Sequence, residues 1–359
     1  MQMAKKVLVA MSGGVDSSVS AAILQEQGYE VYGATMKLFA NETIGIGREK
    51  TCCSLKDAED ARFVCQRLGI PHYVFNFTKD FQKYVIEPFG KAYEDGETPN
   101  PCLECNRFLK FQRFLQRALL LDFDYIATGH YARRQYDAES QRYQLKKALD
   151  PKKDQSYMLY TMRQQELEKT LFPLGELTKN QVRELARKWG FANAQKKDSQ
   201  DICFVPNGNY GAFLEENLHI KSPKGVILNN QGEKIGEHKG IIHYTIGQRR
   251  RIGLACGKPV YVIEKNAAEN TITVGDEALL YRNKTIVKNV NLLSVAALTE
   301  PVRVKAKTRY KQPETDAVIF PLAKGDFAIV FAKPQKALAK GQAAVFYVED
   351  TVLGGGTIC

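Results

Sequence analysis

Two cysteines stand three residues apart in the stretch TPNPCLECN, residues 98–106. The two prolines stiffen the approach, and the pattern that follows predicts a helix beginning at about Leu103. Cys105 is then expected in the first helical turn, where the helix dipole favours a thiolate. On spacing alone, a reactive thiol and a small buried residue explain Cys102 and Cys105 equally well.

A third cysteine, Cys203, lies in the segment KKDSQDICF, and the lysines at 196 and 197 make its surroundings basic. The other cysteines carry less chemical context. Cys65 falls on the apolar face of an expected helix, which is typical of a core residue. Cys52 and Cys53 are left unassigned, and nothing in the sequence gives a role to Cys256 or Cys359.

The stretch VLVAMSGGVDSSVSAAIL predicts a phosphate-binding turn. A strand ends, two glycines allow a tight turn, and Ser, Asp and Ser open a helix whose N–H groups suit a phosphate. The Lys of a Walker A loop is missing, and the spacing is not that of a dinucleotide fingerprint. SGG alone would be an ordinary capped turn, but SGGVDSS between the first strand and first helix of an α/β domain favours the phosphate site.

Alternating strand and helix patterns over residues 1–150 must position these groups. Such a rhythm predicts a doubly wound parallel sheet with helices on both faces, which binds ligands at the carboxyl ends of its strands. Strands are expected at 7–11, 30–36, 72–77 and 125–128. Helices are expected at 17–27, 57–68 and 104–121, and Ser54 is the expected N-cap of the second of them. Further helices are expected over 155–191, with Thr178 as a helix cap.

After Pro206 the sequence changes to short β-rich runs separated by Gly, Asn and Pro. This pattern predicts small β modules or barrels. We expect three domains: an α/β domain at 1–205, a central β-rich domain at 206–283, and a C-terminal β-barrel at 284–359.

The composition is that of a globular protein with a basic surplus: 51 Lys and Arg against 40 Asp and Glu among 359 residues. A net charge of +11 favours a polyanionic partner. The apolar run at 7–11 is too short for a signal peptide, and no run of 18 apolar residues predicts a membrane span. We therefore expect a cytoplasmic protein in which cysteines serve catalysis or metal binding more than structural disulfides.

The loop SGGVDSS resembles the pyrophosphate loop of the N-type ATP pyrophosphatases, which cut ATP between its α and β phosphates. The resemblance implies that ATP and Mg²⁺ bind here, with Asp16 near the phosphates and the metal ion. Met36, at the end of the second strand, would lie at the adenine, and Gly129 would allow close approach to the nucleotide. The implied loop residues are Ala10, Met11, Ser12, Gly13, Gly14, Val15, Asp16 and Ser17.

Together with GHYAR, TPNPCxxCN, KDQSY, DSQDICF and YTIGQRRRIG, the loop resembles the tRNA-specific 2-thiouridylases over the whole chain. The resemblance implies that ATP adenylates the C2 oxygen of a wobble uridine in tRNA. Cys203 would carry persulfide sulfur from a donor protein, and Cys105 would be the nucleophile that completes transfer, leaving a transient Cys105–Cys203 disulfide. It also implies a monomer acting on tRNAs of the Lys, Glu and Gln type.

The same resemblance implies residues that contact the RNA. Asn100, Pro101 and Cys102 would line the target base. The implied tRNA contacts are His130, Lys153, Asp154, Gln155, Arg309, Tyr310 and Gln342. Independently, RVKAKTRYK places basic residues at period two on one face of an expected strand, and segment 284–359 holds 11 Lys and Arg against 6 Asp and Glu.

Several alternatives stay open. Many members of the family carry Asp where Cys102 stands, so any proton-transfer role at that position is in doubt. Cys102, Cys105 and Cys203 could instead ligate a [4Fe–4S] cluster, although three thiolates are one short of the usual four; zinc lacks a second cysteine pair. A small-molecule ligase with the same loop, or a non-catalytic RNA-binding protein, are the competing functions.

Overall fold

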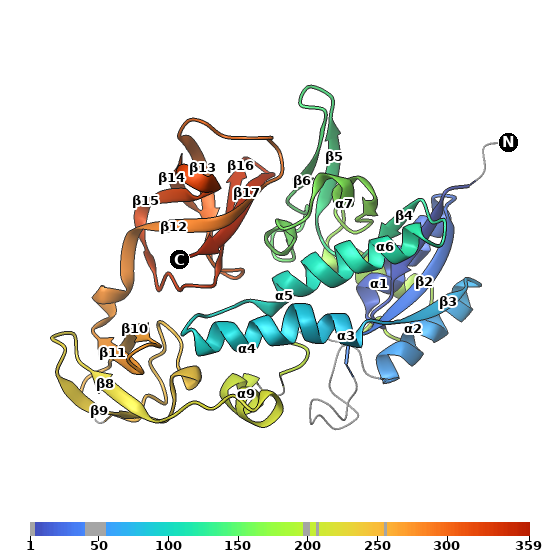
Figure 1. The fold of residues 1–359 in the computed structure, drawn as a ribbon. Helices are drawn as coiled ribbons and strands as arrows, with labels where there is room; N and C mark the ends of the chain where they lie inside the picture. The colour runs from blue at the N-terminus through green and yellow to red at the C-terminus, as the bar shows by residue number, and fades with distance from the viewer. Residues whose placement is uncertain (1–3, 40–54, 197–201, 206–207, 255–256) are drawn as a thin grey trace.

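The computed structural model describes residues 4–39, 55–196, 202–205, 208–254 and 257–359. Figure 1 shows an α/β unit on the right, a small central unit at lower left and a barrel above it. Six positions named above lie outside the described residues: Cys52, Cys53, Ser54, Lys197, Pro206 and Cys256. No helix in the described ranges combines the length and apolar character needed to span a membrane.

The first sheet is parallel throughout, with strand order β3-β2-β1-β4-β7. Four of its strands match the expected ones to within a residue or two, and the short β7 is an addition. The strands are β1 (Lys6–Ala10), β2 (Glu30–Lys37), β3 (His72–Asn76), β4 (Tyr125–Ala127) and β7 (Thr170–Leu171).

Both faces of this sheet are covered, so the doubly wound prediction is confirmed. Val7 and Val9 of β1 pack into one core with α1 (Val15–Glu26), α2 (Leu55–Leu68) and α8 (Lys179–Lys188). Leu8 and Ala10 point to the opposite core, which two long helices cover. Successive residues of β1 point to opposite faces because side chains alternate along a strand. Both sets are apolar because both faces of the sheet are buried.

The two long helices on the second face each contain a wider π-helical stretch. The first runs through α3 (Thr78–Phe81), η2 (Gln82–Ile86) and α4 (Glu87–Glu94). The second runs through α5 (Pro101–Glu104), η3 (Cys105–Arg113) and α6 (Phe114–Leu119). The sequence predicted the second helix, over 104–121, but not the first.

The rest of the α/β unit leads toward the barrel. A hairpin of β5 (Arg133–Asp137) and β6 (Arg142–Lys146) precedes η4 (Ser156–Leu159) and α7 (Gln164–Glu168). The hairpin does not join the parallel sheet. Its strand β6 pairs with the barrel through Lys146 and Thr351, and Figure 1 shows it standing between the two units.

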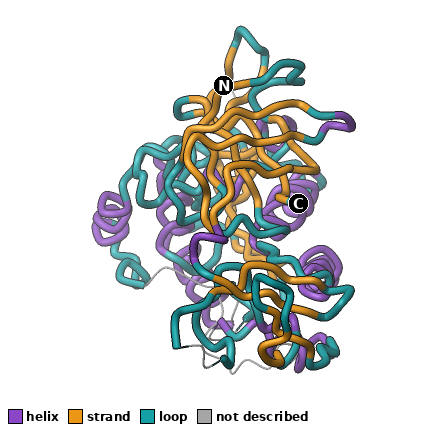
Figure 2. Tube along the Cα trace, turned by 90° about the vertical axis from the view of Figure 1, so that its left-hand side faces the viewer, coloured by secondary structure: helices purple, strands orange, loops and turns teal. Residues whose placement is uncertain are grey.

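The central unit combines one helix with a four-stranded sheet of order β10-β11-β8-β9. Its elements are α9 (Tyr210–Leu218), β8 (Gly225–Leu228), β9 (Lys234–His238), η6 (Ile241–His243), β10 (Tyr261–Asn266) and β11 (Thr271–Gly275). Residues 247–253 hold the QRRR motif and connect η6 to β10. Viewed from the side, the strands of this unit lie below those of the barrel (Figure 2).

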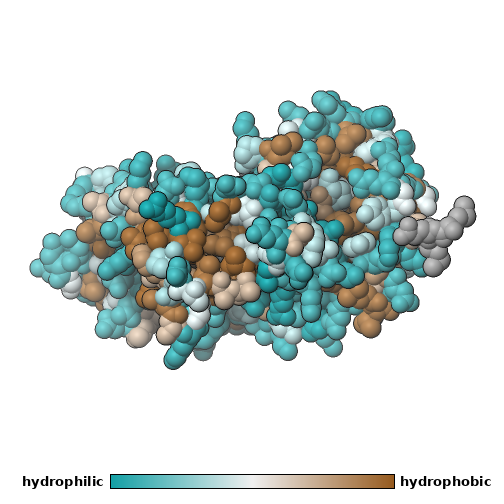
Figure 3. Space-filling view, turned by 90° about the horizontal axis from the view of Figure 1, so that it is seen from above, coloured by the Kyte–Doolittle hydropathy of each residue, from teal (hydrophilic) through white to brown (hydrophobic). Residues whose placement is uncertain are grey.

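Six antiparallel strands form the C-terminal unit, and an extra pairing of β12 with β17 closes it into a barrel. After η7 (Glu277–Leu280) they are β12 (Tyr281–Leu292), β13 (Val302–Lys307), β14 (Thr315–Pro321), β15 (Phe327–Lys336), β16 (Ala343–Val348) and β17 (Thr351–Ile358), with η8 (Ala323–Gly325) before β15. The boundary expected at 283/284 therefore falls inside β12. Figure 3 shows hydrophobic side chains gathering over the barrel side of the face seen from above.

Candidate active site at the carboxyl ends of the parallel strands

The turn between β1 and α1 needs glycine because another backbone lies against it. Gly13 has a φ of +69°, and a Cβ added there would lie 2.3 Å from the carbonyl oxygen of Asp57. Gly14 follows in extended conformation as the N-cap of α1. The tight turn and the exposed helix start give the loop the geometry that suits a phosphate.

Serine hydroxyls hold the loop in shape. Ser17 Oγ accepts from the backbone N–H of Ser12 at 3.2 Å and donates to the carbonyl of Gly14 at 3.1 Å. Ser18 Oγ donates to the same carbonyl at 3.0 Å. The loop is therefore organised by its own side chains before any ligand binds.

Asp16 carries the carboxylate of the loop. Both of its oxygens accept from Lys179 Nζ at 2.8 Å, and the hydroxyl of Tyr131 donates to Oδ1 at 2.7 Å. These contacts join the first turn of α1 to the start of α8 and to the segment after β4. Lys179 was not predicted as a site residue, because it lies 163 positions from Asp16 with no local pattern to mark it.

Residues shortly before Cys203 also hold the loop. Asn193 Nδ2 donates to the carbonyl of Gly13 at 3.1 Å and to Ser18 Oγ at 2.9 Å. Lys196 Nζ donates to the same carbonyl at 3.2 Å and to the carboxylates of Asp57 and Asp60, both at 2.7 Å. Sequence reasoning noted Lys196 only as a basic neighbour of Cys203 and missed Asn193.

The remaining predicted ATP residues lie at the same edge of the sheet. Gly129 follows β4, and a Cβ there would lie 2.8 Å from the backbone N of Ser17. This glycine therefore lets the end of β4 approach α1. Met36 is half-buried near the end of β2 and packs against the second core. The buried Met11 continues β1, where its carbonyl accepts from Thr35 Oγ1 at 2.9 Å.

The helix that carries Cys102 and Cys105 begins earlier than expected. Asn100 is its N-cap, with Oδ1 accepting from the N–H of Cys102 at 3.2 Å, and Pro101 is its first residue. Cys105 already donates its N–H within the helix to Pro101. The prediction that Cys105 lies in the first turn is therefore wrong, because Asn and Pro are well suited to the N-cap and first position. Cys102 occupies that turn instead.

The segment just before this helix, residues 98–100, is attached to the barrel and is called the lip below. The N–H of Thr98 donates to the carbonyl of Lys340 at 2.8 Å, and Gln342 Nε2 donates to the carbonyl of Thr98 at 2.6 Å. On the other side, Asn106 Nδ2 donates to the carbonyl of Met158 at 2.9 Å. The cysteine helix thus begins between the barrel and η4.

Cys203 packs against the same hydrophobic cluster as Cys105. Its neighbour Phe204 packs its ring against Phe81, Phe89 and Phe213, with centroids 5.3–5.5 Å away. Cys105 and Cys203 are both half-buried and pack against the same hydrophobic cluster. The two cysteines therefore border one extended cluster, which reaches from Leu8 of β1 to Val352 of β17.

Glu104, between the two cysteines of the motif, is a further acid that the sequence reasoning passed over. Burial raises the pKa of its carboxyl, and the guanidinium of Arg107 partly opposes this. Cys65, by contrast, is fully buried, and burial raises the pKa of its thiol to about 12. Its assignment to the core is confirmed.

The described residues also bear on which metal ions the site could hold. Within the described part of the chain, which includes all three cysteines, no three His, Cys, Asp or Glu side chains are grouped to hold a metal ion. A [4Fe–4S] cluster needs its thiolates gathered around one point. A Mg²⁺ ion held mainly by substrate phosphates needs only one or two carboxylates, and Asp16 in the loop satisfies that.

Several residues predicted to contact tRNA hold the protein itself. His130 is buried, its Nδ1 lies 2.8 Å from Thr128 Oγ1, and burial with the charge of Lys110 keeps its pKa well below the usual range. Asp154 accepts from Ser156 Oγ at 2.8 Å, and Gln155 Oε1 accepts from the N–H of Tyr131 at 2.9 Å. These groups shape the turn beside the loop. Lys153 is half-buried in the same turn.

The barrel residues predicted for tRNA lie near the lip. Arg309 Nη2 donates to the carbonyl of Ala337 at 2.8 Å, and the half-buried ring of Tyr310 lies 6.0 Å from that of Tyr157. Along β13 the side chains of Arg303 and Lys305 are exposed and Lys307 is half-buried, while the residues between them are buried. The basic residues thus share one face of the strand, as predicted.

The fold and the loop define a class: an α/β protein of the adenine nucleotide alpha hydrolase type followed by two β units. Family models match accordingly, the "tRNA methyl transferase HUP domain" at 5–207, its "PRC-barrel domain" at 211–276 and the "Aminomethyltransferase beta-barrel domain" at 282–358. The chain is 50% identical to the tRNA-specific 2-thiouridylase of Acetivibrio thermocellus, over 99% of each chain. It is 45% identical to one from Clostridium botulinum, again over 99% of each. The chain belongs to the tRNA-specific 2-thiouridylase family.

Solved structures show weaker likeness. A predicted subunit of a tRNA methyltransferase from Methanocaldococcus jannaschii is 17% identical with a TM-score of 0.31, covering 60% of this chain and 87% of its own. A 4-thiouridine synthetase–RNA complex with bound ATP is 19% identical with a TM-score of 0.36, covering 56% and 46%. Likeness at this level supports no inference about the site.

Proposed function

We propose that this protein uses ATP to place sulfur on C2 of the wobble uridine of tRNA. One observation carries the proposal: a preorganised phosphate loop and a cysteine-bearing helix start lie on the same α/β unit, with Cys105 and Cys203 against one core. Family membership supports the same substrate, because the relatives are named for tRNA 2-thiolation. A tRNA of the Lys, Glu or Gln type is the proposed acceptor.

ATP would bind at the loop Ala10–Ser17, with Met36 toward the adenine and Gly129 beside the first turn of α1. The N–H groups at the start of α1 would receive the phosphates. Asp16 would hold a Mg²⁺ ion, which neutralises charge on the phosphates as pyrophosphate leaves. Lys179, 2.8 Å from Asp16, keeps that carboxylate oriented until the ligand arrives.

The chemistry proceeds in three substitutions. The C2 oxygen of uridine attacks the α-phosphorus of ATP, forming the O-adenylated base and releasing pyrophosphate. The terminal sulfur of a Cys203 persulfide then attacks C2 and displaces AMP, which leaves the base joined to Cys203 through a disulfide bond. Cys105 thiolate attacks the Cys203 sulfur, releasing 2-thiouridine and forming the Cys105–Cys203 disulfide. Splitting one hard substitution into two gives each step a better leaving group.

A variant of the second step has Cys105 attack the persulfide first. The Cys105–Cys203 disulfide then forms before the base reacts, and hydrosulfide is the nucleophile that displaces AMP. Either route ends with a disulfide, so a thiol reductant must supply two electrons before a donor protein reloads Cys203. The target base would lie against Asn100, Pro101 and Cys102.

The RNA would be held around the lip and turn. We assign its contacts to Lys153, Arg309, Tyr310 and Gln342, with His130, Asp154 and Gln155 shaping the turn that faces it. The hydrogen bond from Gln342 to the carbonyl of Thr98 supports a base pocket next to the barrel.

The test is direct. Purified protein is incubated with ATP, Mg²⁺, a persulfide sulfur-donor protein, a thiol reductant and unmodified tRNA, and nucleosides are analysed by mass spectrometry. We expect 2-thiouridine together with AMP and pyrophosphate. Pyrophosphate without thiolated RNA would favour a small-molecule ligase, and absence of both products would favour a non-catalytic RNA-binding protein. Stoichiometric iron in anaerobically purified, active protein would contradict the persulfide route.

A further inference from the structure

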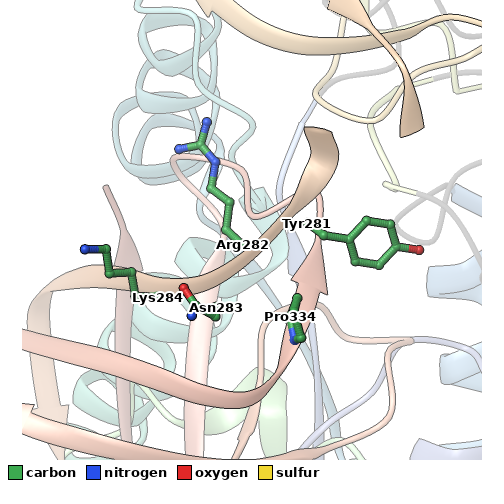
Figure 4. Close-up of a pocket in the computed structure, with 5 residues that line it drawn as sticks. All are labelled: Tyr281, Arg282, Asn283, Lys284 and Pro334. Atoms are coloured by element: carbon green, nitrogen blue, oxygen red, sulfur yellow. The ribbon is translucent and has the colours of Figure 1, made fainter. Parts of the chain in front are cut away.

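A hollow of about 390 Å³ opens on the barrel between the start of β12 and the end of β15. Figure 4 shows the side chains that line it, and all but one come from the start of β12. They are Tyr281, Arg282, Asn283, Lys284 and Pro334. None of these residues belongs to the site described above.

The hollow exists because β15 leaves its partner strand here. Arg282 pairs with Gln335 and Lys284 pairs with Val330, so four residues of β15 bulge out opposite the single residue Asn283. Pro334 lies in that bulge and has no N–H to donate to a ladder. The bulge therefore leaves the start of β12 accessible.

The two cations at the hollow are available for a ligand. Arg282 and Lys284 are exposed, and neither side chain has an ion-pair partner among the residues that the structure describes. By contrast, Lys336 on the partner strand β15, opposite Tyr281, pairs with Glu277. Unpaired cations held at an open hollow are suited to anions.

The arrangement suits an extended polyanion better than one small anion. In Figure 4 the guanidinium of Arg282 and the ammonium of Lys284 point in different directions from the strand, so they do not converge on one point. Residues two apart on a strand are separated by about 6–7 Å. That spacing is comparable to the spacing of successive phosphates along a nucleic-acid strand.

An aromatic ring and an amide complete the set. Tyr281 is 46% exposed although its ring is large and apolar, and Asn283 is exposed beside it. Exposed rings stack on bases or riboses, and amides donate to phosphate and sugar oxygens. An acidic protein segment would use the cations but would not need the ring.

Hydrogen bonds and close packing connect the hollow to the proposed tRNA surface. The N–H of Ala337 donates to the carbonyl of Leu280, next to Tyr281, at 2.9 Å. The carbonyl of Ala337 accepts from Arg309, and a Cβ on Gly247 of the QRRR connection would lie 3.0 Å from the Cβ of Ala337. The hollow is thus joined through Leu280 and Ala337 to Arg309 of the proposed tRNA surface and to the QRRR connection.

We propose that this hollow binds the sugar–phosphate backbone of tRNA at a point separate from the target uridine. Arg282 and Lys284 contact phosphates, and Tyr281 packs on a base or ribose. The inference rests on the proposed function for the identity of the RNA. It adds an RNA contact that neither the cysteine motif nor the basic strand β13 contains.

The test measures tRNA binding directly. The double variant R282E/K284E should bind unmodified tRNA about ten- to a hundredfold more weakly at moderate salt, and the slope of log K against log salt should fall in magnitude by about 2. Tyr281→Ala should weaken binding severalfold, and Tyr281→Phe should bind like the wild type. The matched control R187E/K188E makes the same charge change at the exposed end of α8 and should bind normally.

Unchanged affinity and slope in R282E/K284E, with normal thermal unfolding, would overturn the proposal and point to an acidic protein partner. An equal loss in R187E/K188E would also overturn it, since only net charge would then matter. The readout is independent of catalysis. A wild-type protein that binds tRNA but forms no 2-thiouridine would defeat the proposed function and leave this site standing.

Discussion

At Gly13, both the lack of space and the backbone conformation disfavour any side chain. A methyl group there would meet the carbonyl of Asp57 at 2.3 Å and would also sit at a φ of +69°. Gly13→Ala should therefore displace the loop and weaken ATP binding by at least tenfold, as measured by calorimetry. Gly28→Ala is the control, because Gly28 has a φ of +84° with nothing within 4 Å of an added Cβ. It should cost about 1 kcal/mol of stability and leave ATP binding unchanged.

Replacing the proposed sulfur carrier should stop sulfur transfer without affecting substrate binding. Cys203→Ser should abolish thiolation, because a hydroxyl cannot carry persulfide sulfur, while ATP and tRNA still bind with their normal dissociation constants. Cys359→Ser changes an exposed cysteine and should leave thiolation intact. Full thiolation by Cys203→Ser would show that the sulfur is carried elsewhere.

Which site residues the sequence could reveal depends on how local their pattern is. The loop at 10–17 and the cysteines at 102 and 105 lie in short sequence motifs whose residue types indicate their chemistry. Asn193 and Lys179 do not, since each acts on the loop from more than 160 positions away and forms no motif. The helix start was misplaced because Asn100 and Pro101 looked like part of a turn and are the cap and first residue.

At the level of the helix, the cap at Asn100 should matter for both stability and catalysis. Asn100→Ala leaves the N–H of Cys102 without its side-chain acceptor and should cost about 1 kcal/mol, seen as a lower unfolding temperature. Thiolation should fall as well, because the start of the cysteine helix loses its fixed position.

Asn209→Ala is the matched control. Asn209 caps α9 in the same way, with its side chain accepting from Ala212 at 3.3 Å, and it lies in the central unit. It should lower stability by a similar amount and leave the rate of thiolation per folded molecule unchanged. Equal losses of activity in both variants would mean that the cap at Asn100 serves stability alone.

The elements that sequence patterns missed are those that tertiary packing stabilises. The helix through 78–94 contains Pro88 and Gly90, which usually interrupt helices, but Phe81 and Phe89 bury their rings in the core. The strands of the hairpin at 133–146 are polar, and their edge is completed by Thr351, about two hundred residues later. The remaining strands of the first sheet were predictable because burial on both faces makes them apolar.

For the molecule as a whole, one lysine at the junction of the central and α/β units makes stability depend on pH. Lys265 Nζ donates to the carbonyl of Tyr244 at 2.9 Å and lies 5.7 Å from the ring centre of Tyr93. Burial lowers the pKa of this lysine to about 8, and the charge of Glu97 opposes the shift.

Because the folded pKa lies below the unfolded value, the unfolded state binds more protons between about pH 8 and 10.5. The contribution of Lys265 to stability therefore rises with pH across that window, by up to about 3 kcal/mol. Relative to Lys265→Met, the wild type should gain unfolding temperature between pH 7.5 and 9.5. Parallel pH profiles for the two proteins would show that Lys265 is accessible to water in the native state.

The pairing of β6 with β17 has a consequence for how the chain is made. The hairpin leaves the ribosome before Thr351 and the strand that it begins have been synthesised. At about 5–20 residues per second, the interval is on the order of 10–40 s. Throughout it, the nascent chain carries a strand edge whose partner does not yet exist, and unpaired edges invite association with other chains. The polar sequence of the hairpin, with RRQYD on one strand and RYQLK on the other, lowers that hazard during synthesis.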